Sequence, residues 1–433
     1  MHVHSIRQTS PAPIGALLRA AMAAGMATMA LPVAAATANL VSTWSANLGG
    51  GNTVRTAGIT ALGAGGGTCS STSGGMGAQV VGSITLIATD TLIGYPGGLG
   101  ADCGTPTGGA GGVDTDPIAD YRGGNGGLGF NGDGIAETGA GGGAATTVYR
   151  NATTQVAFAG GGGGAGGDAV SVNNTQVQGG IPGAGSGAGA NGAPGGTGNT
   201  YGAATGGNGG GGGFSPWWRG EDAGNATCSS GPCGGPAGGG AGSYNAWAAL
   251  DGAAAVTQAA GGGGGGGGAS AGPGLNLPQY SPASSWAAGS ASVMYIDITA
   301  GSVNDASVGG AYAGTSFAAD GGWTGLTWAL DGACPGCSLP ASLTIGSSTG
   351  AISGTVTAAA GSYTFDVVAS GNPSSGPLST FALETRRAVT MSVTSAPAPA
   401  SAQAIPTLSE WRLILLSGFI GLLALAALRR QRQ

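Results

Sequence analysis

Apolar and polar residues alternate along several short stretches of the chain, which is the pattern of a β-strand with one buried face. The stretches from Tyr363 to Ala369 and from Val389 to Val393 show it most clearly, and turn residues separate them from their neighbours. The pattern predicts a β-sandwich of about ninety residues, which we place at residues 301–395. Its inward-facing positions would be Tyr363, Phe365, Val367, Ala369, Val389, Met391 and Val393.

Three more strand patterns interrupt the glycine-rich region at residues 37–300, and they read AQVVGSITLIATDTLIGYPGG, AATTVYRNATTQVAFAG and ASVMYIDITAG. The middle one predicts a hairpin in which Ala145–Tyr149 pairs with Gln155–Phe158 around Asn151. Glycine-rich sequence is ordinarily a flexible linker, because glycine loses the most backbone freedom on ordering. A linker does not need repeated hydrophobic strands, so we predict a folded β domain from which glycine segments project.

Glycine accounts for 97 of the 433 residues, far above the roughly 7% of ordinary chains. Extended glycine segments can order without side chains if they form three-fold left-handed helices close enough for backbone hydrogen bonds. Collagen itself is excluded, because the glycines follow no strict third-residue period. The predicted fold class is therefore mostly β: a glycine-rich β scaffold with polyglycine segments, an Ig-like β-sandwich and one C-terminal transmembrane helix.

Both ends of the chain carry targeting patterns. Near the N-terminus, basic residues, the apolar run Ala20–Leu31 and three alanines at 34–36 follow one another, which is the order of a secretory signal peptide. We assign residues 1–36 to it and expect cleavage after Ala36 or Ala38.

At the C-terminus, Leu413–Leu428 supplies sixteen apolar or small residues, or about 24 Å of helix, slightly short of a ~30 Å hydrocarbon layer. Trp411 and Arg412 can extend it, and we expect a transmembrane helix at 412–428. The arginines that follow favour a cytoplasmic tail and an external body.

A Pro/Ala linker at 396–404 leads to the heptapeptide IPTLSEW. With the helix and basic tail, residues 405–433 resemble the IPTL-CTERM sorting signals of Gram-negative bacteria, although Arg412 stands where that family more often has Gly. The resemblance implies a sortase-like membrane enzyme as partner, with the chain in the inner membrane before processing and at the cell surface or outside the cell afterwards. The motif residues are Ile405, Pro406, Thr407, Leu408, Ser409, Glu410 and Trp411.

The predicted sandwich resembles the cadherin-like putative Ig domains of bacterial surface proteins. The resemblance rests on L-P-x-x-L from Leu339, T-G-x-I-S-G-T from Thr349 and Y-T-F from Tyr363, while Ser342 and Val356 depart from the family pattern. The family implies a spacer or adhesion module. Some relatives bind calcium through clustered acids, but here the chain continues DVVASG, so we do not extend calcium binding to it.

The order of elements over residues 49–300 resembles the glycine-rich domain of anaplastic-lymphoma-kinase-type receptors and related bacterial and phage surface proteins. The matching pieces are GAGGGTCSSTSGGMGAQ, DTLIGYPGG, GAGGGAATTVYR followed by QVAFAGGGGGAGG, and VMYIDIT. This resemblance implies an ordered glycine-rich domain.

Export would remove the only histidines, His2 and His4, and the sequence contains no lysine. This excludes Ser-His-Asp and Cys-His catalysis, Schiff-base chemistry and the commonest metal ligand. GSSTG at 346–350 and GASAG at 268–272 match a nucleophile elbow only formally, since no base is present. We predict a non-enzyme without cofactor or metal, structural or adhesive at the cell surface.

Two alternatives remain open. One is a secreted carboxylate-based glycoside hydrolase, for which Asp133 and Glu137 are the candidate acids. The other is a shed matrix component. With eighteen acids against twelve basic residues, all arginine, the chain has no basic stripe for nucleic acid. We therefore expect a glycan or another cell-surface ligand as partner.

Six cysteines in an exported chain indicate disulfides, although fifteen connectivities are formally open. Proximity favours 69 with 103, 228 with 233, and 334 with 337. A redox role for CPGC is the less favoured alternative. The candidates are Cys69, Cys103, Cys228, Cys233, Cys334 and Cys337.

Two loops are candidate binding sites. FSPWWRG sets aromatic side chains beside an arginine, and such clusters can stack on sugar or protein surfaces; the alternative is that they fill a gap in the core. FNGDGIAE has carboxylate spacing like a calcium loop but lacks one acid, so we favour a solvated turn. The candidate binding residues are Phe214, Trp217, Trp218 and Arg219.

Overall fold

The structure is a computed structural model. It describes residues 34–69, 72–103, 109–113, 115–118, 121–126, 135–136, 139–167, 169–170, 176–177, 200–201, 204–205, 227–228, 253–255, 258–260, 270–300, 303–312, 314–333, 337–396 and 408–431.

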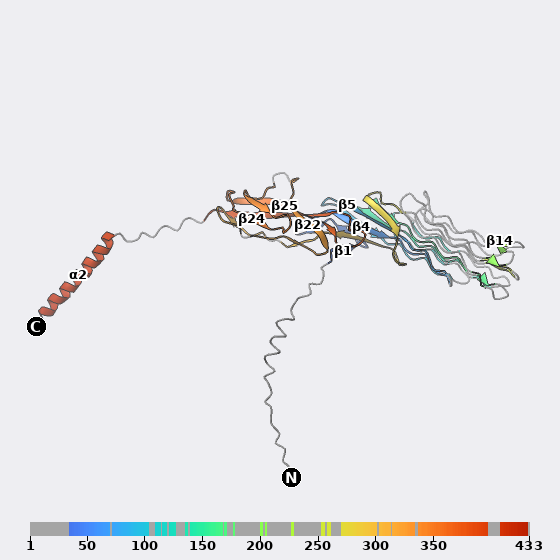
Figure 1. The fold of residues 1–433 in the computed structure, drawn as a ribbon, viewed down its shortest axis with the longest axis horizontal. Coiled ribbons are helices and arrows are strands. Elements are labelled where there is room, and N and C mark those ends of the chain that lie inside the picture. The colour runs from blue at the N-terminus through green and yellow to red at the C-terminus, as the bar shows by residue number, and fades with distance from the viewer. Residues whose placement is uncertain are drawn as a thin grey trace, which may run out of the picture.

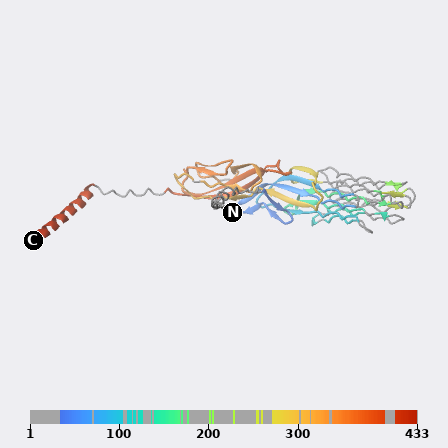
Figure 2. The ribbon, with the colours of Figure 1, turned by 60° about the horizontal axis from the view of Figure 1, so that its bottom comes forward.

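The described body is elongated and built of β-strands, as the sequence predicted, and one helix lies near the C-terminus (Figure 1). Strand β24 lies near one end of the body, β4 and β5 lie in the middle, and β14 lies at the opposite end. This order is kept when the body is turned (Figure 2). Two lobes therefore lie one after the other along the long axis. We call them the N-terminal lobe (β1 to β18) and the C-terminal lobe (β19 to β26).

The strands of the N-terminal lobe are β1 (Ala36–Asn39), β2 (Trp44–Ser45), β3 (Asn47–Gly49), β4 (Asn52–Leu62), β5 (Ala78–Thr85), β6 (Thr91–Tyr95), β7 (Ile135–Ala136), β8 (Thr146–Arg150), β9 (Thr154–Ala159), β10 (Ala169–Val170), β11 (Gln176–Val177), β12 (Thr200–Tyr201), β13 (Ala204–Thr205), β14 (Thr227–Cys228), β15 (Ala253–Ala255), β16 (Gln258–Ala260), β17 (Asn276–Pro282) and β18 (Ser290–Tyr295). Those of the C-terminal lobe are β19 (Ile298–Ala300), β20 (Ala306–Ser307), β21 (Ala318–Ala319), β22 (Trp323–Leu330), β23 (Leu343–Ile345), β24 (Ile352–Gly354), β25 (Gly361–Pro373) and β26 (Leu383–Thr394), and the helix is α2 (Leu408–Arg430).

One large sheet runs through both lobes, in the order β1-β18-β4-β26-β25-β22. Strand β5 pairs with β4, and β17 pairs with β5, so the sheet branches on the N-terminal side. The join is antiparallel, with Glu384 opposite Thr56 and Arg387 opposite Asn52. The two lobes are therefore continuous through backbone hydrogen bonds.

Buried and exposed residues alternate along β26, whereas β25 is buried at five consecutive residues, 365–369. Along β26 the buried side chains include Val389, Met391 and Val393, and along β25 they include Phe365 and Val367. The predicted inward face is confirmed by this burial, except that Tyr363 is only partly buried at the edge of the core. Burial of such side chains drives the folding of this lobe.

The predicted hairpin is also confirmed. Strands β8 and β9 pair with Tyr149 opposite Gln155, and the turn residues Asn151 and Ala152 both have positive φ. The Asn151 side chain holds the turn in place, since its Oδ1 accepts a hydrogen bond from the Thr91 N–H at 2.9 Å.

Seven glycine-rich segments of the N-terminal lobe lie against one another, and we call them the glycine array. They are residues 63–67, 74–77, 97–101, 109–112, 123–126, 139–145 and 160–167.

Segment 139–145 exchanges backbone hydrogen bonds with five other segments of the array. Its carbonyl oxygens accept hydrogen bonds from the N–H groups of Gly67 (2.7 Å) and Gly112 (2.7 Å). Its own N–H groups donate to the carbonyl oxygens of Gly98 (3.0 Å), Gly124 (3.0 Å) and Gly162 (2.9 Å). A strand in a sheet has at most two hydrogen-bonded neighbours. The array is therefore a block bonded in several directions and not a flat sheet.

The approach of these segments leaves no room for side chains. A Cβ added at Gly141 would meet the carbonyl oxygen of Ala110, and one added at Gly162 would meet that of Gly75, both closer than the 3.0 Å that real Cβ atoms keep. Neither glycine has a positive φ. Close packing, and not an unusual backbone conformation, accounts for the glycine content of this part of the chain.

A leucine of the C-terminal lobe completes the junction. Leu378 is buried and packs over β4 at Gly58, where an added Cβ would lie 2.8 Å from the leucine side chain. Val81 of β5 belongs to the same apolar cluster. The lobes thus share a core as well as a sheet.

Adding a methyl group to the array tests its packing. We expect Gly141→Ala to lower the free energy of unfolding by about 1–3 kcal/mol, because the new Cβ overpacks the block. Denaturant unfolding of the purified chain measures this. Gly332→Ala is the matched control, since a Cβ there meets nothing within 4 Å. Equal effects of the two substitutions would contradict the packing described here.

Candidate functional site

Helix α2 is the membrane-directed part of the chain. It has 23 residues, about 35 Å at 1.5 Å per residue, which is enough to cross a ~30 Å hydrocarbon layer. Its segment Trp411–Arg430 is apolar enough to span a membrane, and none of it is buried against the body. The helix begins at Leu408 and contains the membrane span predicted at 412–428.

The charges at the C-terminal end of α2 complement its dipole. Arg429 and Arg430 stand in the last turn, where the helix macrodipole favours positive charge. Within the sorting motif, Leu408 to Trp411 belong to the helix, and Trp411 is exposed. Three motif residues lie outside the described part of the chain: Ile405, Pro406 and Thr407.

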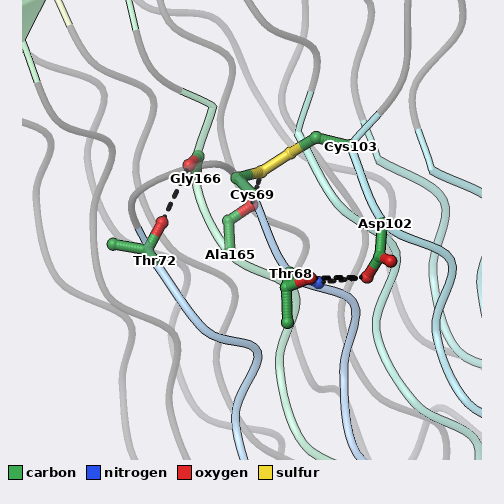
Figure 3. Close-up of a disulfide and its surroundings, with 7 residues drawn as sticks. All are labelled: Thr68, Cys69, Thr72, Asp102, Cys103, Ala165 and Gly166. Carbon is green, nitrogen blue, oxygen red and sulfur yellow. Dashed lines mark hydrogen bonds between the residues drawn. A yellow bond between two sulfur atoms is a disulfide. The ribbon is translucent and has the colours of Figure 1, made fainter.

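A disulfide joins Cys69 to Cys103 (Figure 3), which confirms the pairing predicted from their spacing. Beside it, Asp102 Oδ1 accepts hydrogen bonds from Thr68 N (2.8 Å) and Thr68 Oγ1 (2.7 Å). The Cys103 N–H donates to the Thr68 carbonyl at 2.9 Å. These contacts connect array segments 63–67 and 97–101 just beyond the last residue of each.

The other cysteine predictions are tested only in part. Cys337 is disulfide-bonded, and its predicted partner Cys334 lies outside the described residues. Cys228 ends strand β14, whereas Cys233 lies outside the described part, so the pairing of these two stays a prediction.

The candidate binding residues of both loops fall outside the described residues. They are Phe214, Trp217, Trp218 and Arg219 in one loop and Asn131, Asp133 and Glu137 in the other. Within the part that the structure describes, no group of three His, Cys, Asp or Glu side chains could hold a metal ion.

Neither apparent nucleophile elbow has the local structure of one. GSSTG is the turn between β23 and β24, and Gly350 has a φ of 63° there. Ser270 is buried, and its Oγ accepts a hydrogen bond from the Gly160 N–H at 2.8 Å. A strand-to-helix turn, which a nucleophile elbow requires, is present at neither serine.

A cluster of five charged side chains, which we call the junction cluster, crosses the boundary between the lobes. Arg55 of β4 pairs with Asp331 and, at 3.3 Å, with Glu384. Arg386 lies 3.0 Å from Asp366 and 3.8 Å from Asp331. The side chains of Asp331 and Asp366 are only 5% exposed, so their charges depend on these arginines.

The ionisation of the junction cluster follows from this geometry. Burial acts to raise the pKa of Asp331, but hydrogen bonds from the Ala333 N–H and Arg55, with the charges of Arg55 and Arg386, outweigh it and leave the pKa below its ordinary value. Burial acts to lower the pKa of Arg55, and its bonds to Asp331 and Glu384 raise it on balance. Both partners are therefore charged at neutral pH.

Sequence reasoning did not find the junction cluster. Arg55 and Asp331 are 276 residues apart, and no local pattern connects them. The only signal is that LETRRAVT places two arginines in a chain where charged residues make up 7%.

Comparison with known families supports two of the resemblances. Residues 295–400 match the family described as Putative Ig domain, and residues 403–431 match the IPTL-CTERM motif. A comparison with curated proteins gives no match. The first match covers the C-terminal lobe, and the second covers α2 together with the start of the heptapeptide, 405–407, which precedes the helix. An Ig-like domain followed by a sorting motif fits an exported surface protein that a membrane sorting enzyme processes at its C-terminus.

The junction cluster predicts sensitivity to acid. Because the pKa of Asp331 is lower in the folded chain than its unfolded value of about 3.9, its stabilising effect is present above about pH 4 and is lost as the pH falls through the folded value. We expect Asp331→Asn to lower the free energy of unfolding by about 1–3 kcal/mol at pH 7. The difference in this free energy between the wild type and the variant should become smaller below pH 4. Urea unfolding at pH 7, 4 and 3 measures this, with the exposed Asp305→Asn as control. If the difference between wild type and Asp331→Asn stays constant with pH, the charge of Asp331 does not stabilise the fold.

Removal of the disulfide tests the link within the array. The bridge closes a loop with a sequence separation of 34, for which chain entropy predicts a loss of roughly 3–4 kcal/mol in the Cys69→Ser, Cys103→Ser double variant. Thermal unfolding measures it. Thr72→Ala serves as a control for the neighbourhood, since its hydroxyl donates to Gly166 O at a long 3.4 Å. If both variants unfold alike, the bridge does not stabilise the array.

Proposed function

We propose that this chain is a non-catalytic structural or adhesive protein of the cell surface. In this proposal its N-terminal signal directs export, its C-terminal signal directs sorting, and its two lobes form a rigid projection. The proposal rests on the family matches at 295–400 and 403–431 and on the continuous sheet between the lobes.

The observation that carries the proposal is the direction of β26. Residues 384–387 of this strand pair with β4 of the N-terminal lobe. The strand then runs to Thr394, about 23 Å further at 3.3 Å per residue, where it pairs with Gly361 and β20. The chain thus leaves the C-terminal lobe at the end away from the N-terminal lobe (Figure 1). Held by α2 in a membrane, such a body presents its N-terminal lobe outward.

The composition of the array suits a projecting role. Backbone hydrogen bonds between glycines supply order without a large apolar core, and they present few side chains to proteases. We propose that the segments are polyglycine helices of the three-fold left-handed type, in an ordered domain like the one that the resemblance to anaplastic-lymphoma-kinase-type receptors implies. Ligand contact would then belong to the loops between segments, and a glycan or a cell-surface protein is the proposed class of ligand.

Fractionation of cells that express the full chain tests the sorting step. We expect the wild-type protein to reach the outer surface, where added protease degrades it on intact cells. A variant that lacks residues 405–433 should lose this surface exposure and appear as soluble protein in the periplasm or the medium. Pro406→Ala leaves the span Trp411–Arg430 intact, so we expect this variant to stay in the inner membrane.

Pro397→Ala, in the linker before the motif, is the matched control and should behave like the wild type. A Pro406→Ala protein that reaches the surface normally would show that the helix acts as a plain anchor and would contradict sorting. Wild-type protein found wholly in the medium would favour the shed matrix component instead.

A further inference from the structure

The first strand begins against an acidic residue of the other lobe. The backbone N–H of Ala36, the first residue of β1, donates to Asp320 Oδ2. Asp320 Oδ1 accepts from the Asp297 N–H at 2.7 Å and from Trp323 Nε1 at 3.1 Å. In the strand ladder Ala36 stands opposite Tyr295. The carboxylate of Asp320 is therefore directed at the start of β1.

Among the described residues, no cationic side chain forms an ion pair at this position. Asp320 is partly buried, and the Asp297 side chain beside it accepts a 3.3 Å hydrogen bond from Asn52 Nδ2. None of the ion pairs among the described residues includes either carboxylate. Arg387 turns its guanidinium to the Ile298 carbonyl at 3.1 Å. Burial raises the pKa of Asp320 above its ordinary value, and the charge of Asp297 adds to the rise.

We propose that the mature chain begins at Ala36 and that its α-ammonium group is the cation that pairs with Asp320. This inference rests on the proposed export of the chain. It names a processing site, the Ala35–Ala36 peptide bond, and a binding site for the new N-terminus, the carboxylate of Asp320.

The chemistry is peptide hydrolysis by a signal peptidase that selects small residues before the cut. Water adds to the Ala35 carbonyl carbon and the C–N bond breaks, which leaves a carboxylate on Ala35 and an ammonium on Ala36. The Ala36 nitrogen, which offers one N–H within the peptide, then offers three and carries a positive charge. Such a charge-assisted bond is roughly twice as strong as a neutral one.

The two other predicted cleavage sites would remove the Ala36 nitrogen, which is the hydrogen-bond partner of Asp320. Cleavage after Ala36 or Ala38 satisfies the A-x-A pattern, but either one deletes the N–H that Asp320 holds. Cleavage after Ala38 also deletes three of the four residue pairs between β1 and β18. Ala35 lies against the backbone of Gly322, where an added Cβ would be 2.5 Å from the Ala35 nitrogen.

The first experiment is the N-terminal mass of the full chain recovered from the envelope of an exporting Gram-negative host. We expect the sequence ATANLVS, which starts at Ala36. An N-terminus at Thr37 or Asn39 would overturn the proposed pairing with Asp320 but would still agree with export. An intact Met1 would overturn both this inference and the proposed export.

The second experiment uses the absence of lysine, which leaves the α-amine as the only primary amine of the mature chain. We compare its acylation rate by an amine-reactive ester at pH 7, in detergent, in native full-length protein. Pairing with a carboxylate raises the pKa of the amine, and a rise of about one unit lowers the reactive fraction about tenfold.

Asp320→Asn should therefore raise the rate by about 3- to 10-fold, whereas Asp305→Asn, an exposed acid of the same lobe, should leave it unchanged. Equal rates in all three proteins would overturn the pairing. If Asp320→Asn does not fold, the wild-type protein alone is measured in urea and in the native state. Its α-amine should react at least several-fold faster in urea, and equal rates would overturn the proposed pairing with Asp320.

Discussion

The structure depends on backbone hydrogen bonds between glycine-rich segments that approach, at many of their glycines, closer than a Cβ atom permits. In an ordinary domain, apolar side chains leave water and hydrogen bonding follows. In the glycine array, the amides and carbonyls of 139–145 are shared among five neighbouring segments, and the side chains that remain are mostly alanine methyl groups. The same closeness explains why even alanine is excluded at Gly141 and Gly162.

Such a block has little to fix its own register, so flanking features must set it. The apolar cluster of β4, β5 and β18 lies at its base, the Cys69–Cys103 bridge joins two of its segments, and the Trp286 indole donates to the Gly66 carbonyl. The base in turn continues into the C-terminal lobe through β4 and β26. A force applied through β26 thus passes to the array along one hydrogen-bonded sheet, which a flexible linker between separate domains would not allow.

Local features of the sequence were sufficient for part of this account. Strict alternation predicted the buried face of β25 and β26, the turn at Asn151 predicted the β8–β9 hairpin, and proximity predicted the pairing of Cys69 with Cys103. The join of β4 to β26 could not be predicted, because each strand alternates correctly on its own and nothing local selects its partner. The pairing of Arg55 with Asp331 depends on that join. Hydrophobicity predicted the membrane span at 412–428 but not the first residue of α2, because the first turn of a helix depends on capping and charge. The candidate binding loops lie outside the described residues, so their role stays a prediction.

Hydrogen–deuterium exchange of the purified protein tests most directly whether backbone hydrogen bonds order the glycine segments. Amides bonded within a packed block open only with the larger unit, whereas those of a flexible glycine linker exchange at the rate of free peptide. The account predicts that the peptides spanning 139–145 and 160–167 are protected about as strongly as those of β25 and β26. Exchange of these glycine amides within seconds, while β25 and β26 remain protected, would contradict it.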